Sequence, residues 1–303
     1  MSPVPDIAPV VVFCYNRPWH LQQTIQALQQ NPLARRSRLI VFSDGARKDT
    51  DELAVREVRA YLATVGGFKE VEIVLSEVNR GLATSVIEGV SQVLDQYERV
   101  IVLEDDMVCT TDFLEYMNEA LLTYRSRPDI FSVTGYAPPV QLPKDYPHDL
   151  YLAPRASSWG WGTWRDRWQQ ADWQVRDFES LLTNKQLRQR LTAGGEDLWP
   201  MLVKQQRGVI SSWAVRWTWS QTRQGAYGLY PVRSKIRNIG TDGSGTNFTF
   251  ATEAYGSELE EKKLAMPADL PPDVRVIEAF GRYYRLPFRL RIKNWLKYGI
   301  RPF

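Results

Sequence analysis

Short apolar runs alternate with segments of helical periodicity along the first half of the chain. The run VVVFCY at residues 10–15 is continuous, which is typical of a strand covered on both faces. Pro18 follows where a helix can begin, and Leu21, Ile25 and Leu28 then fall on one helical face. Comparable apolar runs predict further strands at residues 39–42, 71–75, 100–103 and 130–134.

Strands and helices alternate at the spacing of an α/β fold, so we expect a Rossmann-like, mostly parallel sheet flanked by helices. Residues 82–97 have helical periodicity, and Asp112 with Glu115 forms a predicted capping pair for a helix that runs to about residue 124. Ligands of such sheets bind beyond the carboxyl ends of the strands. The polar residues that end the strands should therefore meet in one crevice; they are Asn16, Arg17, Asp44, residues 77–80 and residues 104–106.

The second half has a different pattern. Prolines cluster between residues 138 and 147 and predict a loop-rich crossing, which leads to the aromatic segment SSWGWGTW at 157–164. Helical segments are predicted at 176–192 and 197–224, ahead of a glycine-rich stretch at 240–246.

Basic residues are concentrated at the C-terminus. The chain carries 38 basic and 35 acidic residues, but residues 281–303 hold seven basic residues and no acidic one. Nucleic-acid binding would need basic residues spread over a folded face, so we expect no nucleic-acid partner. Residues 288–298 instead predict an amphipathic helix suited to an anionic membrane surface. Its apolar face comprises Phe288, Ile292, Trp295 and Leu296, and the alternative is a tail packed back on the domain with its arginines paired to acids.

The composition predicts a cytoplasmic protein, peripheral at the inner face of the membrane. The start, MSPVPDIAP, lacks the features of a signal peptide, and no run reaches the roughly 18 apolar residues of a spanning helix. Cys14 and Cys109 border apolar runs, so we expect buried thiols rather than a disulfide framework. His20 and His148 are the only histidines and do not suggest a zinc site.

The triplet Glu104-Asp105-Asp106 is the most informative motif. Consecutive acids are common on surfaces, but these follow a buried strand at the edge where ligands bind. Carboxylates packed there need a cation or hydrogen-bond donors. Mn²⁺ or Mg²⁺ takes one or two carboxylates together with phosphate oxygens, so the triplet predicts a metal site that also holds a nucleotide-sugar diphosphate.

Together these motifs resemble the GT-A glycosyltransferases. The likeness is carried by VVVFCYNR, VFSDGA, VNRGLATSV, VIVLEDDMVCTTDFLEYM and WGWGTW, within residues 8–250. It is strongest to the N-acetylglucosaminyltransferase I type and to bacterial family 2 sugar transferases. It implies a metal-dependent inverting glycosyltransferase that moves a sugar, with N-acetylglucosamine as one candidate, from a UDP-sugar to a glycan or lipid-linked acceptor.

The resemblance implies a role for individual residues. It assigns the uridine base or ribose to Arg17 and Asp44, the ribose to Glu104, the donor sugar to Asp105 and the metal to Asp106. It adds further donor contacts at Asn16, Arg80, Gly81, Trp161 and Ser244.

For two of these further contacts, the resemblance also implies a position in the donor site. Trp161 would form a wall of the donor-sugar site, and Ser244 would lie on a glycine-rich loop that closes over the diphosphate. The structural alternatives are a turn for Asp44 and for residues 79–81, the surface for Arg17, and core packing for Trp161.

An inverting transferase needs a general base that takes the proton from the acceptor hydroxyl. The segment GGED at 194–197 precedes a predicted helix, as in many relatives, so we expect Asp197 to be the base, with Glu196 as second candidate. The alternative is a helix cap. On another alignment the position falls on Ser211 or Ser212, which cannot serve as an unaided base.

We therefore expect residues 1–136 to form the nucleotide-sugar-binding half of one GT-A domain and residues 137–256 its acceptor-side half. Residues 257–280 would be a linker and residues 281–303 a basic amphipathic tail. Two other functions stay open: a catalytically decayed carbohydrate-binding or scaffold protein, and a sugar nucleotidyltransferase. The second requires a glycine-rich loop after the first strand, where this chain has YNRP.

Overall fold

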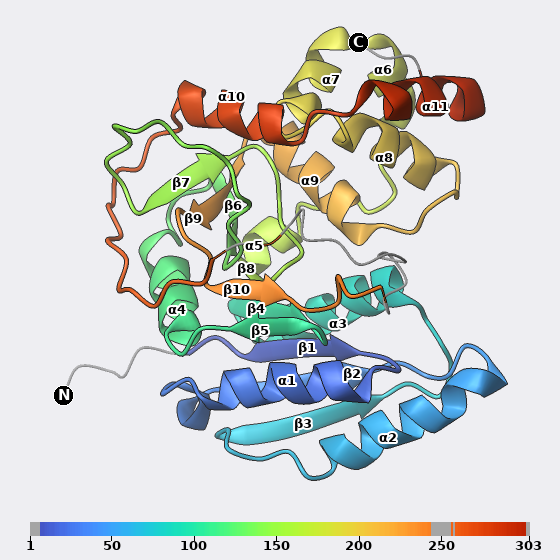
Figure 1. The fold of residues 1–303 in the computed structure, drawn as a ribbon, viewed down its shortest axis with the longest axis vertical. Helices are drawn as coiled ribbons and strands as arrows, with labels where there is room; N and C mark the ends of the chain where they lie inside the picture. The colour runs from blue at the N-terminus through green and yellow to red at the C-terminus, as the bar shows by residue number, and fades with distance from the viewer. Residues whose placement is uncertain (1–6, 244–255, 257, 301–303) are drawn as a thin grey trace.

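The structure is a computed structural model that describes residues 7–243, 256 and 258–300. Its centre is an eight-stranded sheet of order β3-β2-β1-β4-β8-β6-β9-β7. The strands are β1 (Val10–Cys14), β2 (Arg38–Ser43), β3 (Glu70–Leu75), β4 (Arg99–Glu104), β6 (Ile130–Thr134), β7 (Leu150–Ala153), β8 (Trp161–Trp164) and β9 (Tyr227–Pro231). A small antiparallel pair, β5 (Met107–Cys109) and β10 (Ile236–Asn238), lies beside this sheet (Figure 1).

Strands β1 to β4 run parallel, so their carboxyl ends lie at one edge of the sheet. Strand β8 then reverses the direction, because it pairs antiparallel with both β4 and β6. Strands β6 and β9 are parallel, and β7 is antiparallel to β9. The expected α/β fold is confirmed, with the parallel strands in the first half of the chain.

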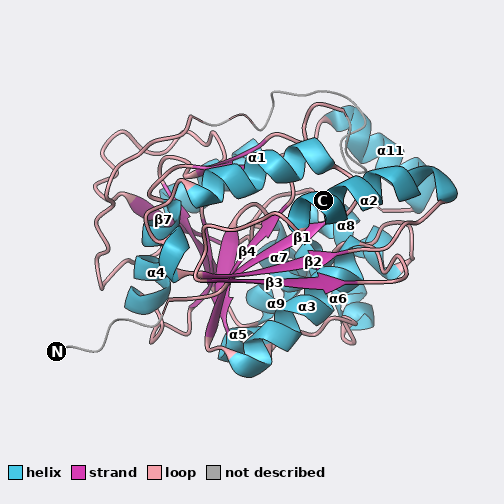
Figure 2. Ribbon diagram, turned by 90° about the horizontal axis from the view of Figure 1, so that it is seen from below, coloured by secondary structure: helices cyan, strands magenta, loops and turns pink. Residues whose placement is uncertain are grey.

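Helices cover both faces of the sheet (Figure 2). Val10 and Val12 of β1 face a core shared with α1 (Pro18–Gln29), α2 (Glu52–Leu62) and α4 (Phe113–Thr123). Val11 and Phe13 face a second core shared with α3 (Leu82–Gln96), α5 (Arg165–Trp168) and α9 (Trp213–Arg223). Burial on both faces is the physical reason for the continuous apolar run in β1. Two 3₁₀ turns, Ala34–Arg36 and Asp49–Asp51, precede β2 and α2.

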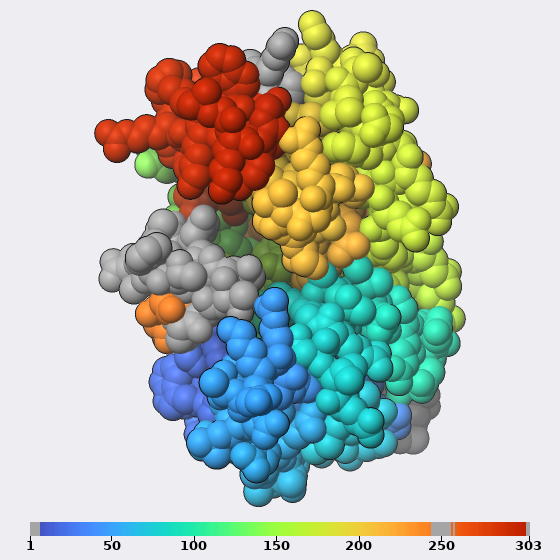
Figure 3. Space-filling view, turned by 90° about the vertical axis from the view of Figure 1, so that its right-hand side faces the viewer, coloured from blue at the N-terminus to red at the C-terminus, as the bar shows by residue number. Residues whose placement is uncertain are grey.

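Shorter helices form the end of the molecule that lies away from strands β1 to β3 (Figure 1). They are α6 (Phe178–Thr183), α7 (Lys185–Thr192) and α8 (Leu198–Gln206), and they pack beside the C-terminal helices α10 (Val274–Tyr283) and α11 (Phe288–Tyr298). Figures 1 and 3 show the red C-terminal segment next to these yellow helices, away from the blue N-terminal strands.

Two of the predicted helical segments are interrupted. The segment 176–192 breaks at Asn184, whose side chain accepts a hydrogen bond from Leu187 N at 3.1 Å and caps α7. The segment 197–224 breaks before Ser212, which caps α9 in the same way. The tail helix spans Phe288–Tyr298 as predicted, while α10 begins at Val274, inside the segment expected to be a linker.

The predicted capping pair at α4 is wrong in one respect. Asp112 does precede the helix, but its side chain does not cap it. Its carboxylate instead accepts hydrogen bonds from Lys235 Nζ at 2.5 Å and from Lys262 N at 3.1 Å. The Lys235 side chain is fully buried, so leaving its charge without a carboxylate would cost more free energy than leaving the helix end without a side-chain cap.

The expected buried thiols are confirmed. Cys14 and Cys109 are both free and buried, and burial raises the pKa of Cys109 to about 12. Over the described part of the chain, no helix has the length and apolar character needed to cross a membrane.

Candidate active site

A cavity of about 770 Å³ opens at the carboxyl ends of the parallel strands. We call it the strand-end cavity. It is bounded by residues that follow β1, β2 and β4, by the segment before α3, and by the beginnings of α8 and α9. The predicted site residues that line it are Asn16, Arg17, Asp44, Gly81, Glu104, Asp105, Asp106 and Asp197.

The acidic triplet lies against one cation, Arg17. Arg17 Nη2 donates hydrogen bonds to Asp105 Oδ1 and, at 2.7 Å, to Asp106 Oδ2. The carboxyl groups of Asp105 and Asp106 are 6% and 8% exposed, so they could not remain charged there without such a partner. The guanidinium therefore compensates charge at the end of β4 in this structure.

The backbone of the segment after β10 lies directly against the same carboxylate. Asn238 Nδ2 is 3.4 Å from Asp106 Oδ1, and Asn238 Oδ1 accepts a hydrogen bond from Gly240 N at 2.7 Å. A Cβ on Gly240 would overlap Asp106 Oδ2 and stand 2.7 Å from Arg17 Nη1. Glycine at this position lets the chain approach the acid site from the second half of the molecule.

Asp44 is held by backbone groups rather than by another side chain. Its carboxylate accepts hydrogen bonds from Arg80 N at 2.8 Å, from Gly81 N at 2.9 Å and from Gly45 N at 3.0 Å. Gly81 has a φ of +74°, which favours glycine, and it stands at the start of α3. Asp44 thus ties the end of β2 to the beginning of α3 at the floor of the cavity.

Asp197 lines the cavity from the beginning of α8. Arg155 holds its carboxylate with two hydrogen bonds of 2.8 Å, and the guanidinium also stacks on Tyr284, 3.9 Å from the ring centroid. The Asp197 side chain is 23% exposed, so a ligand in the cavity can reach it. Ser211 and Ser212 line the same cavity, but Ser212 is committed to capping α9.

A comparison with known protein families shows which family the chain belongs to. Residues 10–187 match the sequence profile of the family described as Glycosyl transferase family 2. The chain belongs to this family. The match covers every parallel strand of the first half, together with the acidic triplet and the WGWGTW segment. No curated protein matches the sequence.

Solved structures show weaker similarity. A mannosyltransferase, PcManGT from Pyrobaculum calidifontis in complex with GDP-Man and Mn²⁺, is 16% identical over 55% of this chain and 49% of its own, with a TM-score of 0.37. TarS of S. aureus is 14% identical over 52% of this chain and 28% of its own, with a TM-score of 0.33. An active-site mutant of LgtC is 12% identical over 54% and 60% of the two chains, with a TM-score of 0.34. The chain therefore spans half or less of the length of the first two.

Three expected site residues of this family 2 chain lie outside the strand-end cavity, and a fourth is not among the described residues. Trp161 is 1% exposed and packs in the core against Trp213, with ring centroids 4.9 Å apart. The Arg80 side chain turns outward to Glu88, at 2.8 Å. Glu196 lines a separate cavity, and Ser244 lies outside the described residues.

The position of Trp161 follows from strand geometry. It begins β8, an inner strand, and alternation along that strand directs its ring onto the face that α9 covers. Trp159, two residues earlier, lies before the strand begins and lines the cavity, with its ring 4.5 Å from that of Tyr136. Trp159, and not Trp161, therefore lines the strand-end cavity.

The sequence interpretation also missed several residues that line the cavity. Arg155 follows β7 in the segment LYLAPR, so the same rule that found Asp44, a polar residue at a strand end, could have found it. Tyr284 comes from the C-terminal region, and no local pattern connects it to a site more than a hundred residues earlier. Only the fold brings that residue to the cavity.

The acid cluster fits a hard divalent cation. Glu104, Asp105 and Asp106 line the cavity with carboxylate oxygens, which are the ligands that such an ion prefers. Burial, followed by repulsion from Asp106 and Asp105, raises the pKa of Glu104 to about 8, so a further positive charge would be favourable here. Among the described residues, no group of three or more His, Cys, Asp or Glu side chains is arranged to hold a metal ion by itself. Phosphate oxygens of a ligand would complete the set.

The raised pKa of Glu104 predicts that the metal-free protein loses stability as the pH rises. The pKa of Glu104 is about 8 in the folded state, whereas that of an unperturbed glutamate is 4.5. The folded state therefore binds more protons between these values, and the free energy of unfolding falls across that window. We expect a melting temperature several degrees lower at pH 8 than at pH 5.5 in EDTA, measured by calorimetry.

Glu104→Gln isolates this effect. The variant cannot ionise, so it should have a flatter pH dependence and a higher melting temperature than the parent at pH 8. The exposed Glu72→Gln on β3 is the matched control and should follow the parent. An unchanged pH slope in Glu104→Gln would show that Glu104 does not hold the proton.

Proposed function

We propose that this family 2 chain is a metal-dependent, inverting glycosyltransferase that uses a UDP-sugar. The observation that carries the proposal is the convergence of eight expected site residues on one cavity at the strand ends. The acidic triplet follows β4, whereas Asp197 comes from the beginning of α8, and both line this cavity. A donor and an acceptor could therefore be held between a leaving-group site and a base.

The donor would bind at the ends of β1, β2 and β4. Asp44 and Asn16 offer oxygen and nitrogen atoms to the base and ribose, and Glu104 and Asp105 to the ribose and sugar. Asp106 would hold Mn²⁺ or Mg²⁺ with the diphosphate. When bound, this ion supplies positive charge that stabilises the departing diphosphate.

In this arrangement Arg17 has two roles. With no ligand it forms hydrogen bonds to both Asp105 and Asp106, and with a metal ion at Asp106 its guanidinium would be free to contact phosphate or ribose. It therefore prevents two buried carboxylates from repelling each other before the ligands arrive.

Asp197 would act on the acceptor. An acceptor hydroxyl loses its proton to the Asp197 carboxylate as its oxygen attacks the anomeric carbon, and the bond from that carbon to the diphosphate oxygen breaks on the opposite face. The products are the inverted glycoside and UDP. The two hydrogen bonds from Arg155 fix the orientation of the carboxylate for this step.

A panel of nucleotide sugars tests the proposal, with the melting temperature measured in Mn²⁺ and in EDTA. UDP-sugars should raise it by a few degrees at saturating concentration in Mn²⁺ only, since a ligand that binds the native state stabilises it by mass action. A larger shift with GDP-sugars would overturn the choice of UDP. A protein that binds the donor but never hydrolyses or transfers it would be the catalytically decayed alternative.

The C-terminal helix supports a peripheral membrane location near a lipid-linked acceptor. The apolar residues expected on one face of α11 are exposed, and Phe288 and Leu296 most of all, at 74% each. Arg289, Lys293 and Lys297 lie on the same helix. An adjacent side of the helix is docked, because Arg291 binds Glu196 at 2.6 Å and Asn294 is buried. The tail therefore packs on the domain through one side of α11 and leaves these apolar residues exposed.

We expect the double substitution Phe288→Ser with Leu296→Ser to reduce recovery on anionic vesicles several-fold in a flotation assay, because the helix loses apolar surface that would enter the headgroup region. Leu53→Ser, at another exposed apolar position, is the control and should float as the parent does. These substitutions are preferable to removing the tail after Ala279, because Phe280 is fully buried. Equal recovery of the parent and the double variant would contradict the membrane assignment.

A further inference from the structure

A second cavity of about 540 Å³ lies between the helices α7 and α8 and the C-terminal helices α10 and α11. We call it the tail cavity. Its volume is within the roughly 300–1,000 Å³ of small-molecule sites. Nothing in the proposed transfer reaction uses it.

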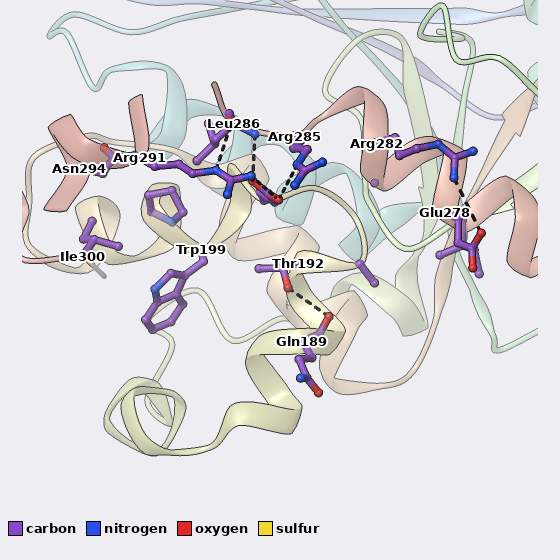
Figure 4. Close-up of a pocket in the computed structure, with 15 residues that line it drawn as sticks. Gln189, Thr192, Trp199, Glu278, Arg282, Arg285, Leu286, Arg291, Asn294 and Ile300 are labelled. Atoms are coloured by element: carbon purple, nitrogen blue, oxygen red, sulfur yellow. Dashed lines mark hydrogen bonds and ion pairs between the residues drawn. The ribbon is translucent and has the colours of Figure 1, made fainter. Parts of the chain in front are cut away.

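The interior of the tail cavity is apolar. Trp199 and Pro200 of α8, Ile277 of α10, Leu286 and Ile300 line it, and Figure 4 shows Trp199 and Ile300 on one side of the opening. Gly281 of α10 also lines it. A surface of this kind favours a hydrocarbon group over a polar ligand.

Arginines and two glutamates, Glu196 and Glu278, line the rim of the tail cavity. Arg282 and Arg285 line it, and their side chains are 67% and 68% exposed. Among the described residues, the acidic partner of each is distant: Arg282 is 3.8 Å from Glu278, and Arg285 is 3.5 Å from Glu196 (Figure 4). Exposed pairs at such distances contribute little, so both guanidinium groups are available to an anion.

One thin wall separates the tail cavity from the strand-end cavity. Glu196 and Trp199 line the tail cavity, whereas Asp197 and Leu198, between them in sequence, line the strand-end cavity. The same alternation occurs at residues 284 and 285, where Tyr284 faces the strand-end cavity and Arg285 the tail cavity. A ligand with two chemically different ends could therefore occupy both sides of this wall.

We propose that the tail cavity binds the hydrocarbon chain of a lipid-linked acceptor, and that Arg282 and Arg285 bind the phosphate that joins the chain to its glycan. This inference rests on the proposed transfer function and names the acceptor class. The apolar lining takes the chain, the arginines take the phosphate, and the glycan extends past the wall toward Asp197. The exposed apolar side of α11 lies on the same C-terminal segment, so such a chain can pass from a bilayer to the cavity.

The test measures binding of dodecyl phosphate below its micelle concentration by titration calorimetry, with the full-length protein. Binding should be detectable for dodecyl phosphate and absent for inorganic phosphate and for dodecanol, because each lacks one half of the recognised group. Dihexanoylphosphatidic acid represents a two-chain membrane lipid and should bind more weakly. Tighter binding of that lipid, or equal binding of inorganic phosphate or dodecanol, would overturn the proposal.

Substitutions locate the site. Gly281→Leu places a side chain in the cavity and should abolish binding, whereas Gly281→Ala should not, because a Cβ there meets only Ala193 O at 3.5 Å. Arg282→Gln and Arg285→Gln should each weaken binding about 5- to 10-fold through loss of a charged hydrogen bond. Arg289→Gln removes the same charge from the tail outside the cavity and should have no effect.

Parent-like affinity in Gly281→Leu, or an equal loss in Arg289→Gln, would contradict the assignment. The melting temperature of each variant is measured with a UDP-sugar and Mn²⁺ in parallel. A protein that responds to the donor but not to dodecyl phosphate would refute the acceptor site and leave the proposed function intact. The reverse result would retain a lipid site and refute the donor.

Discussion

Replacing Asp197 with asparagine is expected to lower the transfer rate by roughly 10²–10⁴ while donor binding remains. The amide keeps the shape of the side chain and can still accept a hydrogen bond from Arg155, but it cannot accept a proton from the acceptor. The measurement is the rate of sugar transfer at saturating donor, together with the affinity for UDP in Mn²⁺.

Glu196→Gln is the matched control for this prediction. It makes the same chemical change one residue away, but Glu196 faces the tail cavity and binds Arg291, so its effect on transfer to a soluble acceptor should be far smaller. If Glu196→Gln abolishes transfer and Asp197→Asn does not, the base is Glu196. If both variants remain active, the segment serves only to hold Arg155 and the tail.

Replacing Asp106 with alanine is expected to remove the part of UDP binding that depends on Mn²⁺, while the fold persists. Loss of residues around a metal ligand typically costs 10- to 100-fold in metal affinity, and loss of the ligand itself should cost at least as much. Calorimetric titration of UDP in Mn²⁺ and in EDTA measures the difference. The parent should show a large difference between the two conditions and the variant almost none.

Asp95→Ala, an exposed acid on α3, controls for the loss of one negative charge. Asp105 still accepts a hydrogen bond from Arg17 in the Asp106→Ala variant, so the guanidinium keeps a partner. An unchanged metal-dependent affinity in Asp106→Ala would exclude Asp106 as the metal ligand. The positive charge of Arg17 would then be the better candidate for stabilising the diphosphate.

The local sequence pattern was sufficient to predict the candidate site residues that lie in the first half of the chain. A strand buried on both faces reads as a continuous apolar run, and its carboxyl end is marked by the first polar residues that follow. Asn16, Asp44 and Glu104 were found in this way, because parallel strands end at one edge and the topology leaves little choice about where those side chains meet.

The predictions that the structure corrected concern side chains with more than one possible partner or direction. Asp112 was expected to cap α4, but the Asp112 carboxylate accepts a hydrogen bond from the buried Lys235, which is more than a hundred residues away in the sequence. Trp161 was expected to face the ligand, but its place at the start of an inner strand directs it into the core. Neither outcome can be read from the flanking residues.

The sequence alone determined the α/β class, the edge at which ligands should bind, the acidic triplet at that edge and the amphipathic character of the C-terminal helix. These features depend on period and order along the chain, which local propensity and burial control. Only the tertiary structure decided that Asp197 and Glu196 face different cavities, that Arg155 and Tyr284 join the site, and that the tail closes a cavity of its own. These facts depend on contacts between residues far apart in the sequence, and such contacts are set by how the helices pack on the sheet.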